Sequence, residues 1–260
     1  MSLKNTLHQK WMKIISQYSS APHESKLLEE GILTPEEFVV AGDCLIANCP
    51  VWAWSSAPEG RSVAYLPADK QYLINRRVIC QSRAQDFGKV MEDETDIGEG
   101  WIQSGESAAV QSVDLEADDE CVDLDELDLD SVEPETKEKP TISYRTYDIT
   151  ICYDNYYHVA HIYLYGIDNN GIPLTLEQMY SDISASHAEK TVTYEDHPFI
   201  SMKFLSIHPC QHSNVILRLI ERLDNPDKFC APMYFFLFLK FIHTVIPTID
   251  ISTPAIEIGE

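Results

Sequence analysis

FLSIHPCQHSNV, residues 204–215, is the stretch around which the rest of the chain is organised. Its first four residues are mostly apolar and predict a short strand. The strand must end at His208, because Pro209 fixes its own φ and pushes the preceding residue towards an extended conformation. After this corner, apolar residues recur at helical spacing and charged residues occupy the other face, which predicts a helix. The apolar positions are Val215, Ile216, Leu219, Ile220 and Leu223.

Cys210 therefore lies at or just before the N-terminus of a helix. Free amide groups and the helix dipole at such a position favour a thiolate, which is the nucleophilic form of cysteine. The alternative is a half-buried cysteine in an ordinary strand–helix corner, since cysteine is often simply a small hydrophobic residue. The local sequence leaves both interpretations open.

Negative charge is concentrated in one segment of this 260-residue chain. Residues 86–138 contain 20 acidic and two basic residues, a local charge of −18 out of a net −23, so the remainder carries only −5. That remainder is long enough to bury one sizeable core. A nucleic-acid-binding protein would carry the opposite sign of charge, so this class is excluded.

Neither the cysteines nor the apolar runs indicate a metal site or a membrane span. The seven cysteines form no C-x-x-C motif, and Cys44 and Cys49 lack a matching second pair, so we expect no zinc site. The N-terminus lacks the apolar core of a secretory signal. The longest apolar run, residues 233–246, is too short to span a bilayer and contains Lys240 and His243. We therefore expect a soluble, reduced, intracellular protein.

Residues 1–22 predict a basic amphipathic helix, with no acidic residue before Glu24. Such a helix can lie on a membrane surface with its lysines against anionic head groups. Each lysine there contributes about 1 kcal/mol and each buried large side chain about 1.5–3 kcal/mol, which suits weak, reversible docking. Packing of the same apolar face on the core is the alternative. The expected membrane contacts are Leu3, Leu7, Trp11, Ile14, Ile15, Lys4, Lys10 and Lys13.

Residues 23–82 predict the first part of the core. TPEE, residues 34–37, is a helix start that combines a capping residue, a proline at the first helical position and a capping box. That helix should end near Asn48. Trp52 and Trp54 must be buried or lie at an interface. Two strands are predicted, at residues 63–66 and 71–79.

Residues 83–140 predict a flexible acidic region that is disordered in the free protein. The segment lacks a sustained apolar period and cannot bury enough surface to become ordered alone. Within it, an aliphatic island stands among carboxylates. The island could fold on the surface of a partner, or it could be part of a solvated linker. It comprises Val122, Leu124, Leu127 and Leu129.

Residues 141–260 predict the second part of the core. Residues 144–153 and 158–166 are rich in Tyr, Ile and Thr and predict an antiparallel pair of strands. A helix at 174–184, a strand at 191–195 and a nearly all-apolar helix at 233–245 follow. The predicted fold class is α+β, an antiparallel sheet with flanking helices segregated from it.

Short motifs occur in a characteristic order along both parts of the core. They are LTPEEFV at 33–39 with AGD at 41–43, CPVW at 49–52, YLP at 65–67, KQ at 70–71, YRTYD at 144–148, DIS at 182–184, KTVT at 190–193 with EDHP at 195–198, FLKF at 238–241 and IPTI at 246–249. Together with the His208-Pro209-Cys210 corner, they resemble the autophagy-related protein 3 family.

The resemblance implies a ubiquitin-conjugating-enzyme-like core and a conjugating activity. Cys210 would accept a ubiquitin-like autophagy modifier from its activating enzyme as a thioester, then transfer it to the amine of phosphatidylethanolamine. Residues 83–140 would recruit the activating enzyme, through the aliphatic island, and a stimulating ubiquitin-like conjugate. The helix at 1–22 would contact the forming autophagosome membrane from the cytoplasm. No cofactor and no metal are implied.

The groups that support Cys210 are less evident. Ordinary ubiquitin-conjugating enzymes place an asparagine just upstream of the cysteine to support the oxyanion, whereas His208 and Pro209 directly precede Cys210 here. By family resemblance, Thr191 and Thr193 are candidate neighbours, and His208 and His212 are further candidates for catalytic support. The modifier-binding Trp-x-x-Leu motif of many family members is absent from the short connection at 224–232.

Two other functions are compatible with the same fold. One is conjugation of the modifier to a protein lysine, against which the basic N-terminal helix argues. The other is a catalytically idle adaptor that binds partners through its acidic arm, against which the intact His208-Pro209-Cys210 corner argues. Charging by an activating enzyme with ATP and modifier distinguishes an enzyme from an adaptor.

Trp11→Asp should weaken membrane binding without preventing thioester formation. The substitution places a charge on the apolar face of the first helix, and a charge is costly to bury in lipid. Liposome flotation and lipidation should both fall several-fold, while charging of Cys210 should survive. If the protein unfolds instead, the helix is a core element.

Overall fold

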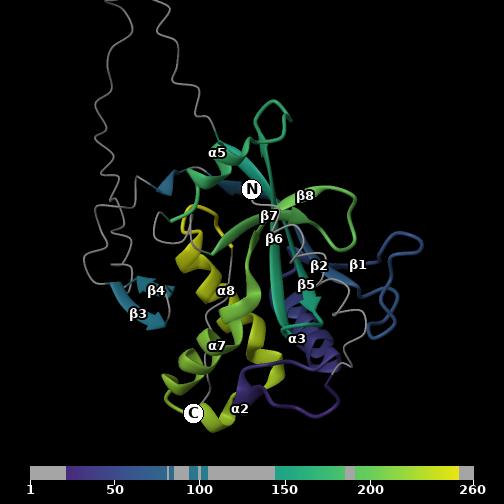
Figure 1. Cartoon of the computed structure of the whole chain (residues 1–260), viewed down its shortest axis with the longest axis vertical. Coiled ribbons are helices and arrows are strands. Elements are labelled where there is room, and N and C mark those ends of the chain that lie inside the picture. The colour runs from purple at the N-terminus through teal and green to yellow at the C-terminus, as the bar shows by residue number, and fades with distance from the viewer. Residues whose placement is uncertain are drawn as a thin grey trace, which may run out of the picture.

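The computed structural model describes residues 22–80, 82–84, 94–98, 101–104, 144–184 and 191–251. A six-stranded antiparallel sheet forms its centre (Figure 1). β2 pairs with β5, so the segments before and after the acidic region build one sheet. In spatial order the strands are β1 (Trp52–Ser55), β2 (Tyr72–Cys80), β5 (Arg145–Asp154), β6 (Val159–Asp168), β8 (Lys203–Ile207) and β7 (Val192–Asp196).

Alternation along the strands gives the sheet two unlike faces. On one face, Ile149 and Ile151 of β5 and Ile162 of β6 join the main core with residues of the three long helices. These helices are α3 (Pro35–Asn48), α7 (His212–Glu221) and α8 (Tyr234–Val245). The opposite face carries a smaller apolar cluster, formed by Tyr72, Ile74, Cys152, Tyr163, Phe199 and Phe204. The predicted α+β fold, an antiparallel sheet with flanking helices, is confirmed.

The shorter helices connect these elements. α2 (Leu27–Glu30) ends at Gly31, whose φ of 68° lies in the left-handed region that glycine adopts without strain. α5 (Leu176–Tyr180) follows β6. Single 3-10 turns are formed by Pro209–Gln211, Pro226–Lys228 and Ala231–Met233.

The start of α3 follows the sequence pattern in detail. The Thr34 hydroxyl accepts the backbone N–H of Glu37 at 3.1 Å, and the Glu37 carboxylate accepts the backbone N–H of Thr34 at 2.8 Å. This reciprocal pair satisfies two amides that the helix cannot bond internally.

Trp52 is buried, and the ring of Trp54 packs edge-to-face on Phe38 of α3. The expected helix start and the expected packing of the two tryptophans are confirmed.

Two predicted elements differ from the observed ones. Residues 63–66 form no strand; β1 at Trp52–Ser55 is the neighbour of β2 instead. The reason is Gln71, whose buried side-chain amide bonds the backbone of Val63 and Leu66 and holds this segment as a loop. The helix expected at 174–184 is only α5, because the chain turns after Tyr180 to place Asp182 in the interior.

A short hairpin lies within the range that we expected to lack regular structure. β3 (Glu94–Gly98) pairs with β4 (Trp101–Ser104), and the hairpin backbone lies beside α7 and α8 (Figure 1). The predicted membrane helix at 1–21 and the aliphatic island at 122–129 lie outside the described residues.

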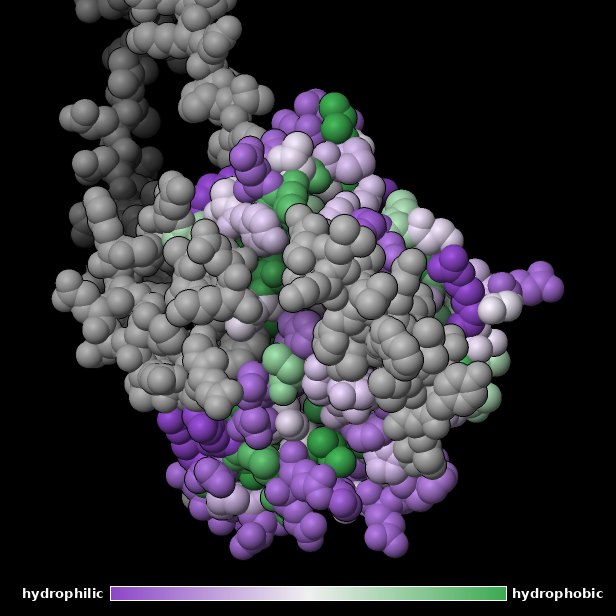
Figure 2. All heavy atoms as spheres, viewed as in Figure 1, coloured by the Kyte–Doolittle hydropathy of each residue, from purple (hydrophilic) through white to green (hydrophobic). Residues whose placement is uncertain are grey.

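The visible surface is of mixed polarity. On the face shown in Figure 2, hydrophobic residues of the described segments form separate patches between hydrophilic ones. Within the described segments, none of the helices combines the length and the apolar character needed to cross a bilayer.

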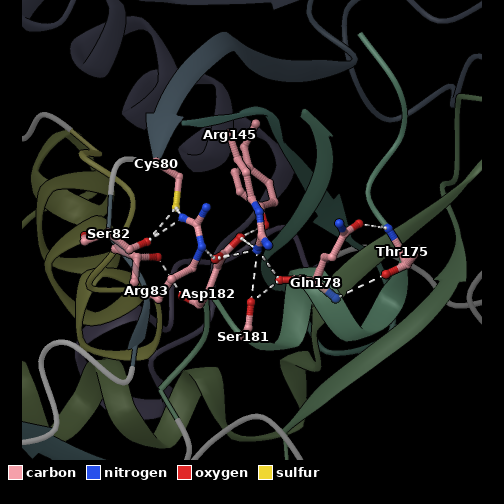
Figure 3. Close-up of polar contacts among 10 residues, drawn as sticks. Cys80, Ser82, Arg83, Arg145, Thr175, Gln178, Ser181 and Asp182 are labelled. Atoms are coloured by element: carbon pink, nitrogen blue, oxygen red, sulfur yellow. Dashed lines mark hydrogen bonds and ion pairs between the residues drawn. The ribbon is translucent and has the colours of Figure 1, made fainter. Parts of the chain in front are cut away.

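The buried carboxylate of Asp182 contacts arginine residues at both ends of the acidic region. Both carboxylate oxygens of Asp182 lie 2.8 Å from Nη1 of Arg145, and Oδ1 lies 3.5 Å from Nε of Arg83 (Figure 3). The Tyr147 hydroxyl donates to the same carboxylate, and the Thr248 hydroxyl donates to the Asp182 carbonyl at 2.6 Å. Residues 83 and 145 flank the acidic region, so one side chain anchors both of its ends.

Asp182→Ala should strongly destabilise the fold. The substitution removes the counter-charge of the partly buried Arg145 guanidinium, whose Nη1 keeps the Gln178 carbonyl and the Ser181 hydroxyl, and it leaves the buried Tyr147 hydroxyl without its acceptor. Breaking a buried charge pair in this way costs about 3–5 kcal/mol. Urea unfolding measures the difference. Asp43→Ala is the comparison, because it removes an exposed ion pair with Lys70 and a hydrogen bond from Nε1 of Trp54, which together should cost only about 1–2 kcal/mol. Equal effects of the two substitutions would contradict the assignment.

Candidate active site

The Cys210 corner is built by the end of β8 and a single 3-10 turn. The backbone N–H of His208 donates to the Thr191 carbonyl at 2.8 Å, which continues the β7–β8 pairing by one residue. Pro209 then starts the turn, and Nδ1 of His208 accepts the backbone N–H of Cys210 at 3.3 Å. α7 begins two residues later, at His212. Cys210 is thus held at an exposed corner by its own neighbours.

Exposure distinguishes Cys210 from most other described cysteines. Cys49, Cys80 and Cys152 are buried, and Cys44 is half-buried. Among the six cysteines in the described segments, Cys210 and Cys230 are exposed. A nucleophile must meet its substrate, so the buried thiols are structural.

Two of the residues expected to support Cys210, His208 and Thr191, contact its turn or the strand end before it. His208 caps the turn and Thr191 binds His208 through its carbonyl, as given above. Thr193 faces Ser206 across the β7–β8 ladder, and its hydroxyl lies 3.3 Å from a carboxylate oxygen of Glu195. His208 therefore acts here as a structural cap on the cysteine turn.

His212 is a core residue, which contradicts the hypothesis that it supports catalysis. Its ring is fully buried against Phe238 and Phe241 of α8, and its Nδ1 donates to the Ala160 carbonyl at 2.9 Å. Burial lowers the pKa of His212 to about 3, so the ring is neutral. A ring enclosed in this way cannot reach an incoming substrate.

The β5–β6 turn beside the corner was not singled out by the sequence. Oδ1 of Asp154 accepts the backbone N–H groups of Tyr156 and Tyr157, both at 2.9 Å, and the Asp154 carbonyl accepts that of His158 at 2.7 Å. His158 has a φ of 55°, a left-handed conformation uncommon outside glycine. The turn presents Tyr157 edge-to-face against His208, with ring centroids 5.7 Å apart.

Beneath this turn, a buried histidine lies between two carboxylates. Nδ1 of His161 is 3.4 Å from Asp154, and Nε2 is 3.4 Å from Glu195 and 2.6 Å from the Ser206 hydroxyl. Burial alone would lower the pKa of His161, but the two carboxylates outweigh it and raise the pKa to about 9. His161 also holds the pKa of Glu195 down, at about 2, against the effect of burial. The three residues form an ion-pair cluster that joins β5, β6 and β7, and the Ser206 hydroxyl adds β8.

A sequence signal for this cluster exists, although it is weak. His161 and Ser206 are polar residues in strands whose other positions are mostly apolar, whereas Glu195 lies in a strand that contains further polar residues. Polar groups buried in strands require partners. Sequence alone cannot show that three such residues from different strands meet, because their register is set by the sheet.

The comparisons with known proteins place these residues in a family. Residues 37–253 match the model of the family described as "Autophagocytosis associated protein, active-site domain". The chain belongs to the autophagy-related protein 3 family. The matched range includes every strand of the central sheet and the whole Cys210 corner. The resemblance drawn from the short motifs is confirmed.

Relatives in this family align with most of the chain. The Dictyostelium discoideum protein named autophagy-related protein 3 is 32% identical, with 96% of each chain covered. The Arabidopsis thaliana protein of the same name is 33% identical, again with 96% of each chain covered. The Schizosaccharomyces pombe protein is 34% identical over 85% of this chain and 88% of its own. Similarity therefore extends beyond the active-site domain.

The charge on His161 should make the fold less stable at alkaline pH. Its pKa is higher in the folded protein, about 9, than the ordinary 6.5, so the stabilisation is complete below pH 6.5 and is lost as the pH rises through 9. Urea unfolding of the wild type should show a loss on the order of 1–3 kcal/mol across this window. His161→Gln should remove that slope.

The acidic side of the profile depends on other buried histidines. Burial lowers the pKa of His197 and of His212 to about 3, so both destabilise the fold as the pH falls below 6.5. His161→Gln should also change that limb, because the His161 charge adds to the lowering of both pKa values and holds the pKa of Glu195 down. An unaltered alkaline slope in the variant would show that His161 is not charged in the folded protein.

Proposed function

We propose that this protein is a ubiquitin-conjugating-type transferase of autophagy, which carries a ubiquitin-like modifier as a thioester on Cys210 and transfers it to the amine of phosphatidylethanolamine. The observation that supports this proposal most directly is the exposed Cys210 on a rigid corner within the matched active-site domain. An acyl carrier needs an accessible sulfur that is held in one position relative to two successive partners.

The chemistry consists of two acyl transfers. In the first, the Cys210 thiolate attacks the thioester carbonyl of the modifier on its activating enzyme, and the enzyme's thiolate leaves. In the second, the neutral lipid amine attacks the new thioester carbonyl, an amide bond forms, and the Cys210 thiolate leaves. Sulfur suits both steps because it is a good nucleophile and a good leaving group at neutral pH.

The partners are assigned by the family resemblance and the sequence patterns. The acidic region at 83–140 would bind the activating enzyme, with the aliphatic island as the contact, and the stimulating ubiquitin-like conjugate. The basic helix at 1–22 would dock the protein, from the cytoplasm, on the forming autophagosome membrane. This division leaves the surface around Cys210 for the modifier and the lipid.

Two alternatives differ from this proposal in measurable ways. Conjugation to a protein lysine would give the same Cys210 adduct, but the product would be a protein and not a lipid. An idle adaptor would form no adduct. Charging followed by transfer to vesicles containing phosphatidylethanolamine distinguishes all three.

Substitution of Cys210 tests the central assignment. Cys210→Ser should form an oxyester that resists thiols, is cleaved by hydroxide and is aminolysed more slowly than the thioester. Cys210→Ala should form no adduct and should melt as the wild type does, because the position is exposed. The measurement is gel analysis after incubation with activating enzyme, ATP and modifier, with and without reductant.

Cys230→Ser is the matched control, since Cys230 is the other exposed cysteine of the described segments. Charging of this variant should equal that of the wild type. A reducible adduct on the Cys210→Ala protein would falsify the assignment and would leave the family resemblance as one of fold alone.

A further inference from the structure

Both acyl transfers pass through a tetrahedral intermediate whose oxygen carries negative charge. Hydrogen-bond donors fixed near that oxygen account for a large part of the rate in such reactions. At this corner the backbone N–H of His208 is bonded to the Thr191 carbonyl, and the backbone N–H of Cys210 points to Nδ1 of His208. These two amides are engaged within the fold, so a side-chain donor beside Cys210 is of interest.

Tyr157 is such a side chain. Its ring packs edge-to-face on His208, the residue that caps the Cys210 turn. Burial and, after it, the charge of a Cys210 thiolate raise the pKa of the Tyr157 hydroxyl to about 12. The hydroxyl therefore stays protonated at neutral pH and can donate a hydrogen bond.

The position of Tyr157 is fixed by several contacts. Asp154 accepts the backbone N–H of Tyr157, and the buried ion pair with His161 fixes the Asp154 carboxylate. The left-handed His158 closes the turn immediately after Tyr157. Unfavourable backbone conformations persist where the surroundings impose them, and they are concentrated at functional sites. A donor held in this way needs no reorganisation when charge develops.

We propose that Tyr157 is a catalytic residue of the acyl transfer at Cys210, whose hydroxyl donates a hydrogen bond to the thioester carbonyl oxygen as that oxygen becomes an anion. This inference rests on the thioester function proposed above. The amine nitrogen attacks the carbonyl carbon, and the carbonyl π electrons move to the oxygen that Tyr157 stabilises. Collapse then reforms the carbonyl, breaks the carbon–sulfur bond and leaves the electron pair on Sγ. The amine proton passes to solvent, and Tyr157 keeps its own proton throughout.

Tyr157→Phe tests the inference, because it deletes the hydroxyl and keeps the ring that packs on His208. The thioester is first formed on each protein, the activating enzyme is then stopped, and single-turnover discharge is measured. Two nucleophiles are compared, phosphatidylethanolamine in vesicles and hydroxylamine in solution. Discharge of the variant should be slower than that of the wild type by about 10- to 100-fold with both, since an oxyanion donor acts on the carbonyl whichever amine attacks.

Tyr156→Phe is the matched control. Tyr156 is the adjacent residue of the same turn, it packs on the ring of Tyr157 at 4.7 Å, and it is 38% exposed. Its discharge rates should equal those of the wild type. The alkylation rate of Cys210 by iodoacetamide and the thermal midpoint should be unchanged in Tyr157→Phe, whereas displacement of the corner would alter them.

The outcomes separate the two proposals. If the wild type forms no thioester, the proposed function fails and this inference fails with it. If the wild type forms and discharges the thioester and Tyr157→Phe discharges at the same rate, the inference alone is overturned. Slowing with the lipid but not with hydroxylamine would also overturn it, because the hydroxyl would then act on the lipid and not on the carbonyl.

Discussion

The ion-pair cluster of Asp154, His161 and Glu195 is the constraint on which the active-site half of the fold depends. Removing one member would leave charge buried without its counterpart, which is far less favourable than never burying the cluster. The three side chains belong to β5, β6 and β7, and Ser206 adds β8. The turn that carries Tyr157 and the strand that leads to Cys210 are therefore fixed with respect to each other by the same histidine.

The two faces of the sheet have different roles. The face covered by α3, α7 and α8 is apolar and supplies the main core. The opposite face carries a small aromatic cluster and, on the strands next to the Cys210 corner, the ion-pair cluster. Stability and chemistry thus depend on different side chains of the same strands, since successive residues point to opposite faces.

Local signals in the sequence predicted local structure well. The Thr34 capping box, the proline after His208 and the alternation in β5 and β6 act over a few residues, and the helix, corner and strand pair followed them. The loop at 63–66 and the short α5 were mispredicted because single distant side chains decide them. Gln71 holds the loop, and the burial of Asp182 ends the helix.

The same contrast applies to the candidate site. Cys210 could be proposed from its motif, and the structure shows it exposed, but His212 lies in the same stretch and belongs to the core. One residue of helical rotation decides whether a side chain at a corner faces solvent or the interior, and the motif does not contain that information. Tyr157 could not be identified from the sequence, because its neighbour His208 is fifty-one positions away in the chain and adjacent only in the folded sheet.

The pairing of Cys80 with Arg145 has a consequence for how the chain can vary in length. These two residues lie opposite each other in the sheet, so the chain leaves the sheet and re-enters it at neighbouring positions. For a flexible connection of the kind that its composition predicts, loop-closure entropy grows only logarithmically, by about 0.6 kcal/mol for each doubling. Large insertions or deletions between β4 and β5 should therefore leave the folding equilibrium of the sheet almost unchanged, so the length of that stretch can vary with little cost to the fold.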